Sequence, residues 1–262
     1  MKIGFIGLGN MAGAMLGGLV KKGFSPADLY GYDVATALAD KRKEELGMQI
    51  CASNKEVVEN AEYLVLAVKP QFLAPVLEEI KPALKATTVI ISIVAGKSIA
   101  WITELLGEVK VVRCMPNTAA LVGEAITAMT PSKTVTEEEL AKAKEIIESF
   151  GRASVVAEHL MDAVVGVSGS APAYVFMFIE AMADAAVLEG MPRAQAYEFA
   201  AQAVYGSAKL MLDTGKHPGE LKDMVCSPAG TTIAAVRTME DKGLRSAVME
   251  GVIAAAEKNK QL

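Results

Sequence analysis

Short apolar runs alternate with amphipathic segments along the first half of the chain. The runs are rich in valine and isoleucine, and most are apolar at nearly every position, as in strands covered on both faces. The longer segments between them repeat apolar residues at helical spacing. This pattern predicts strands over residues 2–8, 28–32, 63–68, 88–94, 109–115 and 153–157, and helices over 11–22, 36–46 and 137–150. Strands and helices in that order predict a doubly wound α/β fold around a parallel sheet.

The second half of the chain changes character after about residue 160. Runs of β-branched residues become rare, and alanine, methionine and glutamate recur at helical spacing. Pro192 stands where helix starts accept proline, and Gly190, Gly215 and Gly243 stand where helices end. We predict helices over residues 170–189, 193–212, 232–242 and 244–259, and two domains, an α/β domain over residues 1–158 and an all-helical domain over residues 159–262.

The predicted helix at residues 170–189 is apolar around most of its circumference. Its large apolar residues include Tyr174, Phe176 and Phe178. A helix that is apolar on most faces has to be buried on most faces, and about a hundred residues of helix offer too little surface for that within one chain. We therefore predict a partner subunit, with a compact monomeric bundle as the alternative. The uncharged stretch at 163–179 is shorter than the roughly 20 residues of a membrane span, which favours a buried core helix.

Composition and charge narrow the class of protein. Hydrophobic residues make up 52% of the 262 residues and charged residues 22%, which excludes a disordered chain. The net charge is −5, and lysine and arginine form no run longer than the three residues 41–43, so we expect no nucleic-acid partner. The three cysteines and two histidines are far apart and predict reduced thiols and no metal site. The apolar segment at residues 3–7 is too short and too glycine-rich for a signal sequence, so we expect a soluble cytoplasmic protein with no membrane partner.

The segment Gly7-Leu8-Gly9-Asn10-Met11-Ala12 matches the dinucleotide-binding pattern G-x-G-x-x-[GA]. It follows the first predicted strand and opens the first predicted helix, which is the context that makes this pattern informative. Gly7 permits the tight turn, Gly9 leaves room for a pyrophosphate, and Ala12 allows close packing of helix on strand. The free N–H groups of Asn10 and Met11 favour a diphosphate. The alternative is a packing turn without a ligand.

Asp33 follows the second predicted strand, where dinucleotide-binding folds choose between NAD and NADP. A carboxylate there bonds the ribose 2′-hydroxyl and repels a 2′-phosphate. The residue therefore indicates use of NADH, or at least tolerance of it. A helix N-cap is the alternative role for Asp33, and we expect Lys41 and Arg42 to lie on the surface of the helix that follows.

Further candidates lie at the carboxyl ends of other strands, because ligands of open α/β sheets bind there. They are Ala67, Val68, Lys69 and Pro70 after one strand, Ala95 and Gly96 after the next, and Asn117 after the last of these. We expect Asn117 and Ala95 to lie near the nicotinamide, and Asn54 to reach the adenosine. Ordinary loop chemistry is the alternative for each.

The segment Ser227-Pro228-Ala229-Gly230-Thr231-Thr232 places hydroxyls and free N–H groups before a predicted helix. Such a helix start is either a site for a substrate carboxylate or a common capped terminus. The serines of the turn at residues 168–170 either cap the next helix or face the same crevice. The second half offers no convincing general acid, which mildly favours an imine substrate, because an imine can arrive already protonated.

Five motifs occur in order along the chain. They are residues 4–11, Ala67-Val68-Lys69-Pro70, Met115-Pro116-Asn117-Thr118, residues 166–170 with Pro172-Ala173-Tyr174, and Leu221-Lys222-Asp223 with Ser227–Thr232. Together they resemble the pyrroline-5-carboxylate reductase family over essentially the whole chain, and the last motif is the most specific.

The resemblance implies reduction of Δ1-pyrroline-5-carboxylate to L-proline by NADPH or NADH. It also implies a Rossmann-type domain, a helical dimerisation domain that interleaves with its partner's, and further assembly of dimers, often into decamers of five dimers. The substrate is then held by Gly230, Thr231 and Thr232, with Thr232 near the ring nitrogen as the catalytic candidate, and by Ser168 and Ser170.

Two departures from the family pattern matter. Many members have Gly-Gly where this chain has Ala229-Gly230, which is tolerable if residue 229 is not left-handed. Members that favour NADPH tend to have serine or a similar residue in place of Asp33.

Two alternative functions also stay open. One is a reductase of the hydroxyacid dehydrogenase kind with Lys209 as its acid, and the other is a dimer that binds NAD without turnover.

Overall fold

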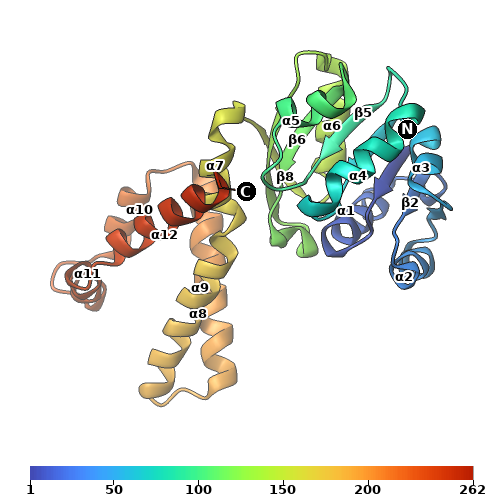
Figure 1. The fold of residues 1–262 in the computed structure, drawn as a ribbon. Helices are drawn as coiled ribbons and strands as arrows, with labels where there is room; N and C mark the ends of the chain where they lie inside the picture. Colours follow the sequence, from blue (N-terminus) through green and yellow to red (C-terminus); the bar gives the residue numbers. More distant parts are fainter. Residues whose placement is uncertain (262) are drawn as a thin grey trace. The chain divides into compact units, whose positions relative to one another are not determined.

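The computed structural model describes residues 1–261 and divides into two compact units (Figure 1). The first, which we call the α/β unit, comprises Met1–Gly169 and the C-terminal residues from Ala255 on. The second, the helical unit, comprises Ser170–Ala254. This division rests on compactness, whereas the predicted domain boundary after residue 158 rests on the change in sequence pattern. That boundary therefore stays a prediction.

The α/β unit is built on one eight-stranded sheet with the order β3-β2-β1-β4-β5-β6-β7-β8. Its first six strands follow the order of a doubly wound dinucleotide-binding fold. The strands are β1 (Ile3–Ile6), β2 (Leu29–Tyr32), β3 (Gln49–Ile50), β4 (Tyr63–Leu66), β5 (Val89–Ser92), β6 (Lys110–Met115), β7 (Ala125–Pro131) and β8 (Gly151–Val155). The predicted fold class is confirmed, and the parallel strands from β1 to β6 place their carboxyl ends at one edge.

Strand β7 was not predicted, and it runs antiparallel to β6. The two strands are joined by a short segment that contains the 3₁₀ turn η3 (Thr118–Val122). A parallel connection needs a crossover of about a dozen residues or more, so this short segment turns the chain back on itself. Helix α6 (Glu137–Ile147) then provides a full crossover, and β8 pairs with β7 in parallel.

Helices cover both faces of the sheet and form one apolar cluster on each. Ile3 and Phe5 of β1 pack with Met15 of α1 on one face, whereas Ile6 packs with Leu73 of α4 on the other, as alternation along a strand requires. The helices are α1 (Asn10–Lys21), α2 (Thr36–Leu46), α3 (Asn54–Asn60), α4 (Pro70–Ile80), α5 (Ile99–Leu106) and α6. The side chains of these two clusters are buried and hold the strand ends in place.

The chain leaves the sheet through α7 (Met161–Val164) and a π-helical turn over Val165–Gly169. The helical unit follows, with α8 (Ala171–Leu188), α9 (Arg193–Thr214), α10 (Pro218–Val225), α11 (Thr231–Asp241) and α12 (Leu244–Asn259). Helix α10 was not predicted. It begins after His217, whose Nδ1 accepts a hydrogen bond from the N–H of Gly219 at 3.1 Å. The end of α12 belongs to the α/β unit, where Asn259 donates to Asp162 at 2.7 Å.

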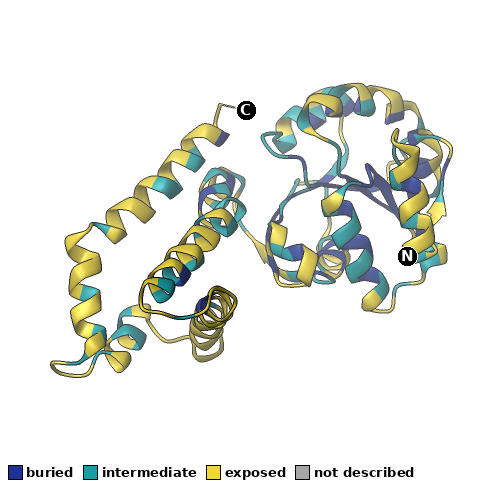
Figure 2. Ribbon diagram, turned by 90° about the horizontal axis from the view of Figure 1, so that it is seen from below, coloured by how far each residue is buried: buried dark blue, intermediate teal, exposed yellow. Residues whose placement is uncertain are grey.

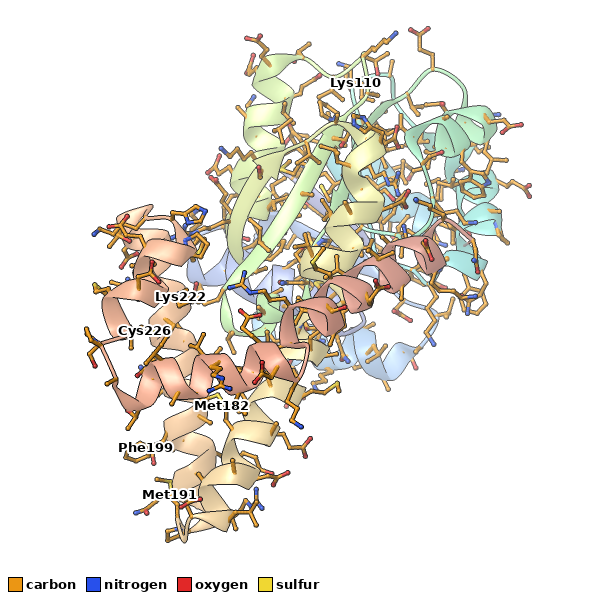
Figure 3. The ribbon with its side chains drawn as sticks, turned by 90° about the vertical axis from the view of Figure 1, so that its left-hand side faces the viewer. Lys110, Met182, Met191, Phe199, Lys222 and Cys226 are labelled. Atoms are coloured by element: carbon orange, nitrogen blue, oxygen red, sulfur yellow. The ribbon has the colours of Figure 1, made fainter. Side chains whose placement is uncertain are left out.

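The two units differ sharply in burial (Figure 2). Of the described residues in the helical unit, only Ala183, Ala196 and Ala200 are buried. Large apolar side chains such as Phe176 and Phe199 are 67% and 65% exposed, and Phe199 is labelled on this unit in Figure 3. Within a single chain α8 is therefore not buried, because it has no neighbour there large enough to cover it, and its burial depends on the partner subunit that the sequence predicts.

One helical stretch of the described chain, Glu158–Leu188, is long and apolar enough by length and composition to cross a membrane. Its mean hydropathy is 1.5, and 6% of its most apolar window is buried. A π-helical turn and Pro172 interrupt its regular α-helical geometry. Length and composition do not separate a membrane span from a helix that a second protein chain covers.

Candidate active site

The glycine-rich loop joins β1 to α1. Gly7 has φ +91°, a conformation that L side chains rarely adopt, and a Cβ at this position would lie 2.8 Å from the carbonyl oxygen of Ala67. Gly9, in contrast, has open space where a Cβ would stand, with nothing within 4 Å. The loop therefore needs glycine at residue 7 for its own shape and leaves residue 9 free for close approach of a ligand.

Helix α1 presents its N-terminus at this loop. Gly9 is the N-cap residue, and among the described residues no side chain caps the helix. The N–H groups of Asn10 and Met11 lie in the first turn, where a helix has no internal acceptors. Ala12 is 1% exposed and packs at the sheet. This loop fits a diphosphate, because it combines unpaired N–H groups, the positive end of the helix dipole and open space at Gly9.

Asp33 accepts hydrogen bonds at both carboxylate oxygens. The N–H of Leu8 donates to Oδ2 at 2.7 Å, and the N–H of Ala35 donates to Oδ1 at 2.8 Å. The N-cap of α2 is Ala35, so the alternative role of Asp33 as a helix N-cap is wrong. The carboxylate instead ties the end of β2 to the glycine-rich loop, and Leu8 uses its N–H in that bond rather than toward the open side.

Arg42, on α2, contacts the glycine-rich loop, and the sequence analysis did not predict this contact. Its side chain is 12% exposed, so the expectation that it lies on the helix surface is wrong. Nε donates to the carbonyl oxygen of Leu8 and Nη2 to that of Gly9, each at 3.3 Å. The sequence carries no signal for these bonds, because they span more than thirty residues and depend on how α2 packs against α1.

Two other predicted loops follow β4, which pairs with β1, and β5, which pairs with β4. Ala67 and Val68 leave β4 half-buried, Lys69 is the N-cap of α4, and Pro70 is its first residue. Ala95 and Gly96 follow β5, and Gly96 has φ +72°. Because β1, β4 and β5 are parallel neighbours, these residues lie at the same edge of the sheet as Gly7.

Asn54 begins α3 and is 6% exposed. Its Nδ2 donates to a carboxylate oxygen of Glu79 on α4 at 2.8 Å. The side chain therefore already joins two helices, and its contact with an adenosine stays a prediction.

Asn117 and Ser168 come together although they are far apart in the sequence. Asn117 follows β6, and its Nδ2 donates to the carbonyl oxygen of Ser168 in the π-helical turn at 3.2 Å. Its Oδ1 is buried and has no hydrogen-bond partner within residues 1–261. The Oγ of Ser168 donates to the carbonyl oxygen of Val164 at 3.0 Å. Two of the sequence motifs thus form one structural feature at the carboxyl edge of the sheet.

Glu158 fixes the segment that leads into this turn. Its Oε1 accepts from Nη1 of Arg113 on β6 at 3.1 Å and from the N–H of Ile99 at the start of α5 at 2.8 Å. One carboxylate therefore joins the chain before α7 to two elements of the sheet layer. This anchoring holds the π-helical turn beside the end of β6.

The second predicted site lies in the helical unit. The turn Ser227–Gly230 closes with a hydrogen bond from the N–H of Gly230 to the carbonyl oxygen of Ser227 at 3.1 Å. Gly230 is the N-cap of α11, so Thr231 and Thr232 are the first two residues of that helix. Their N–H groups lie in a first turn that, within the described chain, no side chain caps. Ser170, just before α8, is the other predicted site residue of this unit.

Ala229 has φ +56° and is the one non-glycine residue with positive φ among residues 1–261. The condition under which alanine would be tolerated there without cost, a residue 229 that is not left-handed, is therefore not met. With proline at the preceding position and the bond from Gly230 back to Ser227, the turn is of type II, which requires positive φ at its third residue. Alanine pays a steric cost there that glycine would avoid.

The groups whose pKa values are raised by burial are too weak as acids to donate a proton readily at neutral pH. Burial raises the pKa of Cys51 to about 11 and of Tyr63 to about 12, and it also raises the pKa of Cys114. All three stay protonated at neutral pH. Lys209 on α9 pairs with Asp213 of the same helix. Over the described residues, no three potential metal ligands gather.

Comparisons with known proteins cover the whole chain. Residues 158–262 match the family model for pyrroline-5-carboxylate reductase dimerisation, and residues 2–96 match a model described as NADP oxidoreductase, coenzyme F420-dependent. The chain is 51% identical to pyrroline-5-carboxylate reductase of Escherichia coli K12, over 100% of this chain and 98% of that one. It is 47% identical to the enzyme of the same name from Methanosarcina acetivorans, over 100% and 97%.

Solved structures agree with the sequence relatives. A pyrroline-5-carboxylate reductase from Coxiella burnetii matches with a TM-score of 0.95 and 32% identity, over 99% of this chain and 97% of that one. Plasmodium falciparum pyrroline carboxylate reductase, solved with NADP bound, matches with a TM-score of 0.89 and 32% identity, over 100% and 97%. With full-length relatives at this level of identity, the chain belongs to the pyrroline-5-carboxylate reductase family.

Proposed function

We propose that this protein reduces Δ1-pyrroline-5-carboxylate to L-proline with NADPH or NADH, the last step of proline synthesis. The observation that carries the proposal is similarity over the whole chain to enzymes of that name, at up to 51% identity among the relatives above. The open glycine-rich loop at the start of α1 supports it independently, because its geometry suits a diphosphate.

The dinucleotide, when bound, supplies the hydride. Gly7, Gly9, Asn10 and Met11 hold its diphosphate through the loop and the first turn of α1, with Leu8 fixing the loop by its bond to Asp33. The remaining proposed contacts lie at the same sheet edge: Asp33 and Asn54 toward the adenosine, Ala67, Val68, Lys69 and Pro70 along the middle, and Ala95, Gly96 and Asn117 toward the nicotinamide.

The substrate carboxylate is bound at the start of α11. Gly230 and Thr231 offer N–H groups there, and the Thr232 hydroxyl is the partner of the ring nitrogen. Ser168 and Ser170 contribute from the serine-rich turn. The substrate arrives as a protonated cyclic iminium, so hydride adds to the carbon of the C=N bond and the nitrogen keeps its proton. Proximity and orientation then provide most of the catalysis, and no general acid is required.

A second copy of the chain covers the apolar helices of the helical unit. The match of residues 158–262 to a dimerisation family supports self-association, and the exposed apolar faces of α8 and α9 give it a physical reason. We extend this to decamers built from five dimers. A protein partner for these faces removes the need for a membrane, and we place the enzyme in the cytoplasm.

Asp33 shifts the cofactor preference toward NADH. Its carboxylate lies at the end of β2, where a 2′-phosphate would meet it. Its oxygens keep lone pairs beyond the two backbone bonds, so the carboxylate can also accept from a ribose hydroxyl.

The direct test follows absorbance at the nicotinamide band, with pyrroline-5-carboxylate and each reduced cofactor in turn. We expect turnover with both. Thr232→Ala should lower kcat/KM for the imine about tenfold or more while leaving cofactor affinity nearly unchanged. Thr238→Ala is the matched control, because Thr238 lies on the same helix and bonds only a carbonyl oxygen of that helix in the described chain. Cofactor binding without oxidation by any cyclic imine would refute the enzyme, and turnover of a hydroxyacid that Lys209→Ala abolishes would favour the rival reductase.

A further inference from the structure

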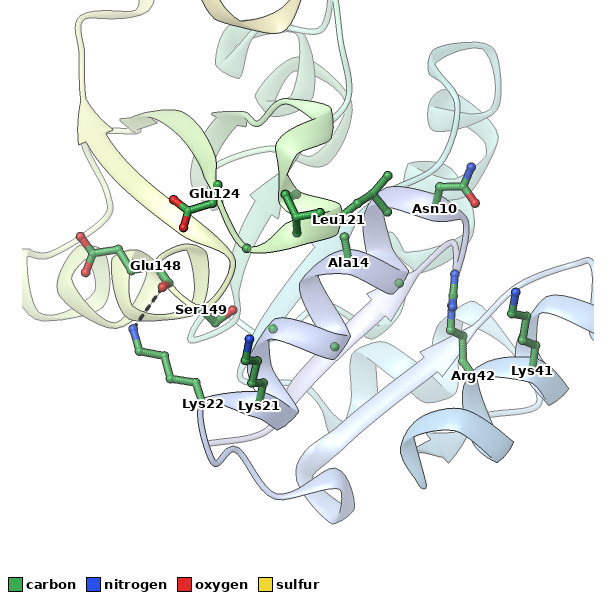
Figure 4. Close-up of a pocket in the computed structure, with 16 residues that line it drawn as sticks. Asn10, Ala14, Lys21, Lys22, Lys41, Arg42, Leu121, Glu124, Glu148 and Ser149 are labelled. Carbon is green, nitrogen blue, oxygen red and sulfur yellow. Dashed lines mark hydrogen bonds between the residues drawn. The ribbon is translucent and has the colours of Figure 1, made fainter. Parts of the chain in front are cut away.

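The side chain of Arg42 leaves its own helix and lies against the first turn of α1 (Figure 4). It lines a groove of about 770 Å³ beside α1, together with Asn10, Gly13 and Lys41. Lys41 is 59% exposed, whereas Arg42 is 12% exposed, so only Arg42 is committed to contacts inside the protein. The chain has placed a nearly buried guanidinium at its glycine-rich loop.

Arg42 makes three directed contacts through its planar donor groups. Nε and Nη2 donate to the carbonyl oxygens of Leu8 and Gly9, each at 3.3 Å, and Nη1 donates to Glu45 at 2.7 Å. Glu45 is half-exposed and lies one turn farther along α2, so it holds the guanidinium from the opposite side. The carbonyl oxygen of Gly9 also accepts the first helical hydrogen bond, from Gly13, which its second lone pair allows.

Gly13 is the residue that makes room for this arrangement. A Cβ on Gly13 would overlap the Nη2 and Cζ atoms of Arg42. Glycine in a helix interior costs about 0.5–1 kcal/mol relative to alanine, so a purely helical role would not favour it there. Gly13 and Arg42 therefore form a matched pair, in which a missing side chain on α1 accommodates a long one from α2.

The bonds to two carbonyl groups determine where two N–H groups point. Each peptide within residues 1–261 is trans, so the C=O and N–H of one peptide point in opposite directions. Holding the carbonyl groups of Leu8 and Gly9 toward Arg42 directs the N–H groups of Gly9 and Asn10 away from it. These are two of the N–H groups that the loop offers to an anion.

We propose that Arg42 is a positioning residue for the cofactor diphosphate, acting through the orientation of the peptides after Leu8 and Gly9. The inference rests on the proposed use of a nicotinamide dinucleotide. It predicts an effect on both cofactors alike, because the diphosphate is common to NADH and NADPH. It also predicts that Gly13 and Arg42 act as one unit.

The experiment measures dissociation constants for NADH and NADPH, by nicotinamide fluorescence, on the full-length wild-type chain and on Arg42→Met, Arg42→Lys, Gly13→Ala and the double variant Gly13→Ala/Arg42→Met. Lys43→Met is the matched control, since it removes an exposed cation from the next position of α2. KM and kcat with pyrroline-5-carboxylate are measured alongside, and thermal unfolding checks that each variant folds.

We expect Arg42→Met to weaken both cofactors by the same factor, about tenfold, because hydrogen bonds from a charged donor are lost. Arg42→Lys should restore part of the affinity, and kcat at saturating cofactor should stay within about twofold, as expected for binding that is uniform between ground and transition states. Gly13→Ala alone should raise the cofactor dissociation constants by the same factor as Arg42→Met. In the double variant it should cause no further loss of affinity beyond that of Arg42→Met. Lys43→Met should bind as the wild type does.

Three results would overturn the inference. Unchanged affinity in Arg42→Met would show that the loop orients itself, and independent, additive effects of Gly13→Ala and Arg42→Met would show that the pair does not act as a unit. A loss confined to NADPH would mean that Arg42 reads the 2′-phosphate instead. If the wild-type chain binds neither cofactor, the proposed function fails first. If Arg42→Met does not fold, the affinities of Arg42→Lys and Gly13→Ala still test the inference. Gly13→Ala should fold, because alanine is a better helix former than glycine.

Discussion

The two compact units of this protein contain similar apolar residues but bury them in opposite ways. In the α/β unit, strands such as β1, β4 and β5 are buried along their whole length between helical layers. In the helical unit, three alanines are the only buried residues among those described, while Phe176, Met177 and Phe199 stay largely exposed. The α/β unit therefore carries a complete core, whereas the helical unit carries half of one and needs a second copy to complete it.

The same contrast appears in the loops that open α1 and α11. Each loop turns the chain into a helix start, and each contains a residue with positive φ. In the α/β unit that residue is Gly7, which adopts the conformation without steric cost. In the helical unit it is Ala229, which does not. The first loop has the residue that its conformation favours, whereas the second has alanine in a conformation that favours glycine.

Adding a charge to the apolar face of α8 should break the helical unit's core and spare the α/β unit. Phe176→Asp places a carboxylate in the surface that the partner covers, and burying an unpaired charge is costly enough to weaken the dimer about a hundredfold or more. Light scattering coupled to gel filtration measures this directly. Phe72→Asp is the control, because Phe72 is 56% exposed on α4 of the α/β unit and its change should leave the oligomer intact.

The opposite result would assign the self-association surface to the α/β unit instead of the helical unit. If Phe176→Asp stayed fully assembled while Phe72→Asp dissociated, the self-association surface would lie on the α/β unit. Far-UV circular dichroism distinguishes dissociation with retained helix from loss of the helical unit altogether, and either result agrees with a core that two chains share.

Two glycines with nearly equal φ test how tightly each unit is packed. Gly7 has φ +91° and Gly190, after α8, has φ +92°. A Cβ at Gly7 would meet the Ala67 carbonyl at 2.8 Å, whereas a Cβ at Gly190 has nothing within 4 Å. Gly7→Ala should cost about 3 kcal/mol or more and abolish tight cofactor binding, since backbone strain and a clash with the Ala67 carbonyl after β4 add together.

Gly190→Ala should cost about 1–2 kcal/mol, from strain alone. Denaturant unfolding gives both values, and cofactor titration should detect a change only at Gly7. Equal destabilisation by the two substitutions would show that the contact with Ala67 relaxes without cost, against the tight packing we assign to the α/β unit.

Asp33→Ser should change cofactor choice by about tenfold in the ratio of kcat/KM values, in favour of NADPH, because it removes a charge that repels a 2′-phosphate. Both cofactors should also bind somewhat less tightly, since Asp33 accepts the N–H groups of Leu8 and Ala35. Asp40→Ser on the exposed side of α2 is the control and should leave the ratio unchanged. An unchanged ratio in Asp33→Ser would reduce Asp33 to a structural tie between β2 and the loop.

The sequence was sufficient for those parts of the fold that depend on local pattern. The apolar runs identified the parallel strands β1, β2, β4, β5 and β6, and the glycine-rich loop lay where the pattern placed it. The two-residue strand β3 and helices α3, α4 and α5 were not predicted. Strand β7 was missed because its apolar residues are interrupted by threonines, and its pairing with β6 and β8 makes it a strand. Helix α10 was not predicted because its start depends on a cap from the His217 side chain.

The missed features of the candidate site share a physical cause, which is dependence on packing between distant segments. Arg42 contacts carbonyl groups more than thirty residues away, and Asn117 reaches Ser168 across fifty-one positions. No local pattern encodes such contacts. The left-handed conformation of Ala229 likewise leaves no trace in the sequence, because the usual signal for a type II turn is a glycine that this chain lacks.

The smallest expected effect is a gain in stability from Ala229→Gly. Relief of left-handed strain contributes about 1–2 kcal/mol, and the greater freedom of glycine in the unfolded chain removes about 0.5–1 kcal/mol, which leaves a net gain of about 1 kcal/mol. The turn should keep its shape, since the bond from Gly230 to Ser227 and the ring of Pro228 do not involve the Ala229 side chain. Urea unfolding should show a higher midpoint with an unchanged slope.

Ala235→Gly in the interior of α11 is the matched control for Ala229→Gly. It makes the same chemical change where φ is helical, so it should lower stability by about 1 kcal/mol. Opposite signs for the two substitutions would locate the strain at residue 229. A loss of stability at both would show that Ala229 does not adopt positive φ in solution, and the contrast between the two helix-opening loops would then disappear. If Ala229→Gly is more stable but turns over more slowly, the rigidity of alanine at this turn is part of how the start of α11 holds the substrate carboxylate.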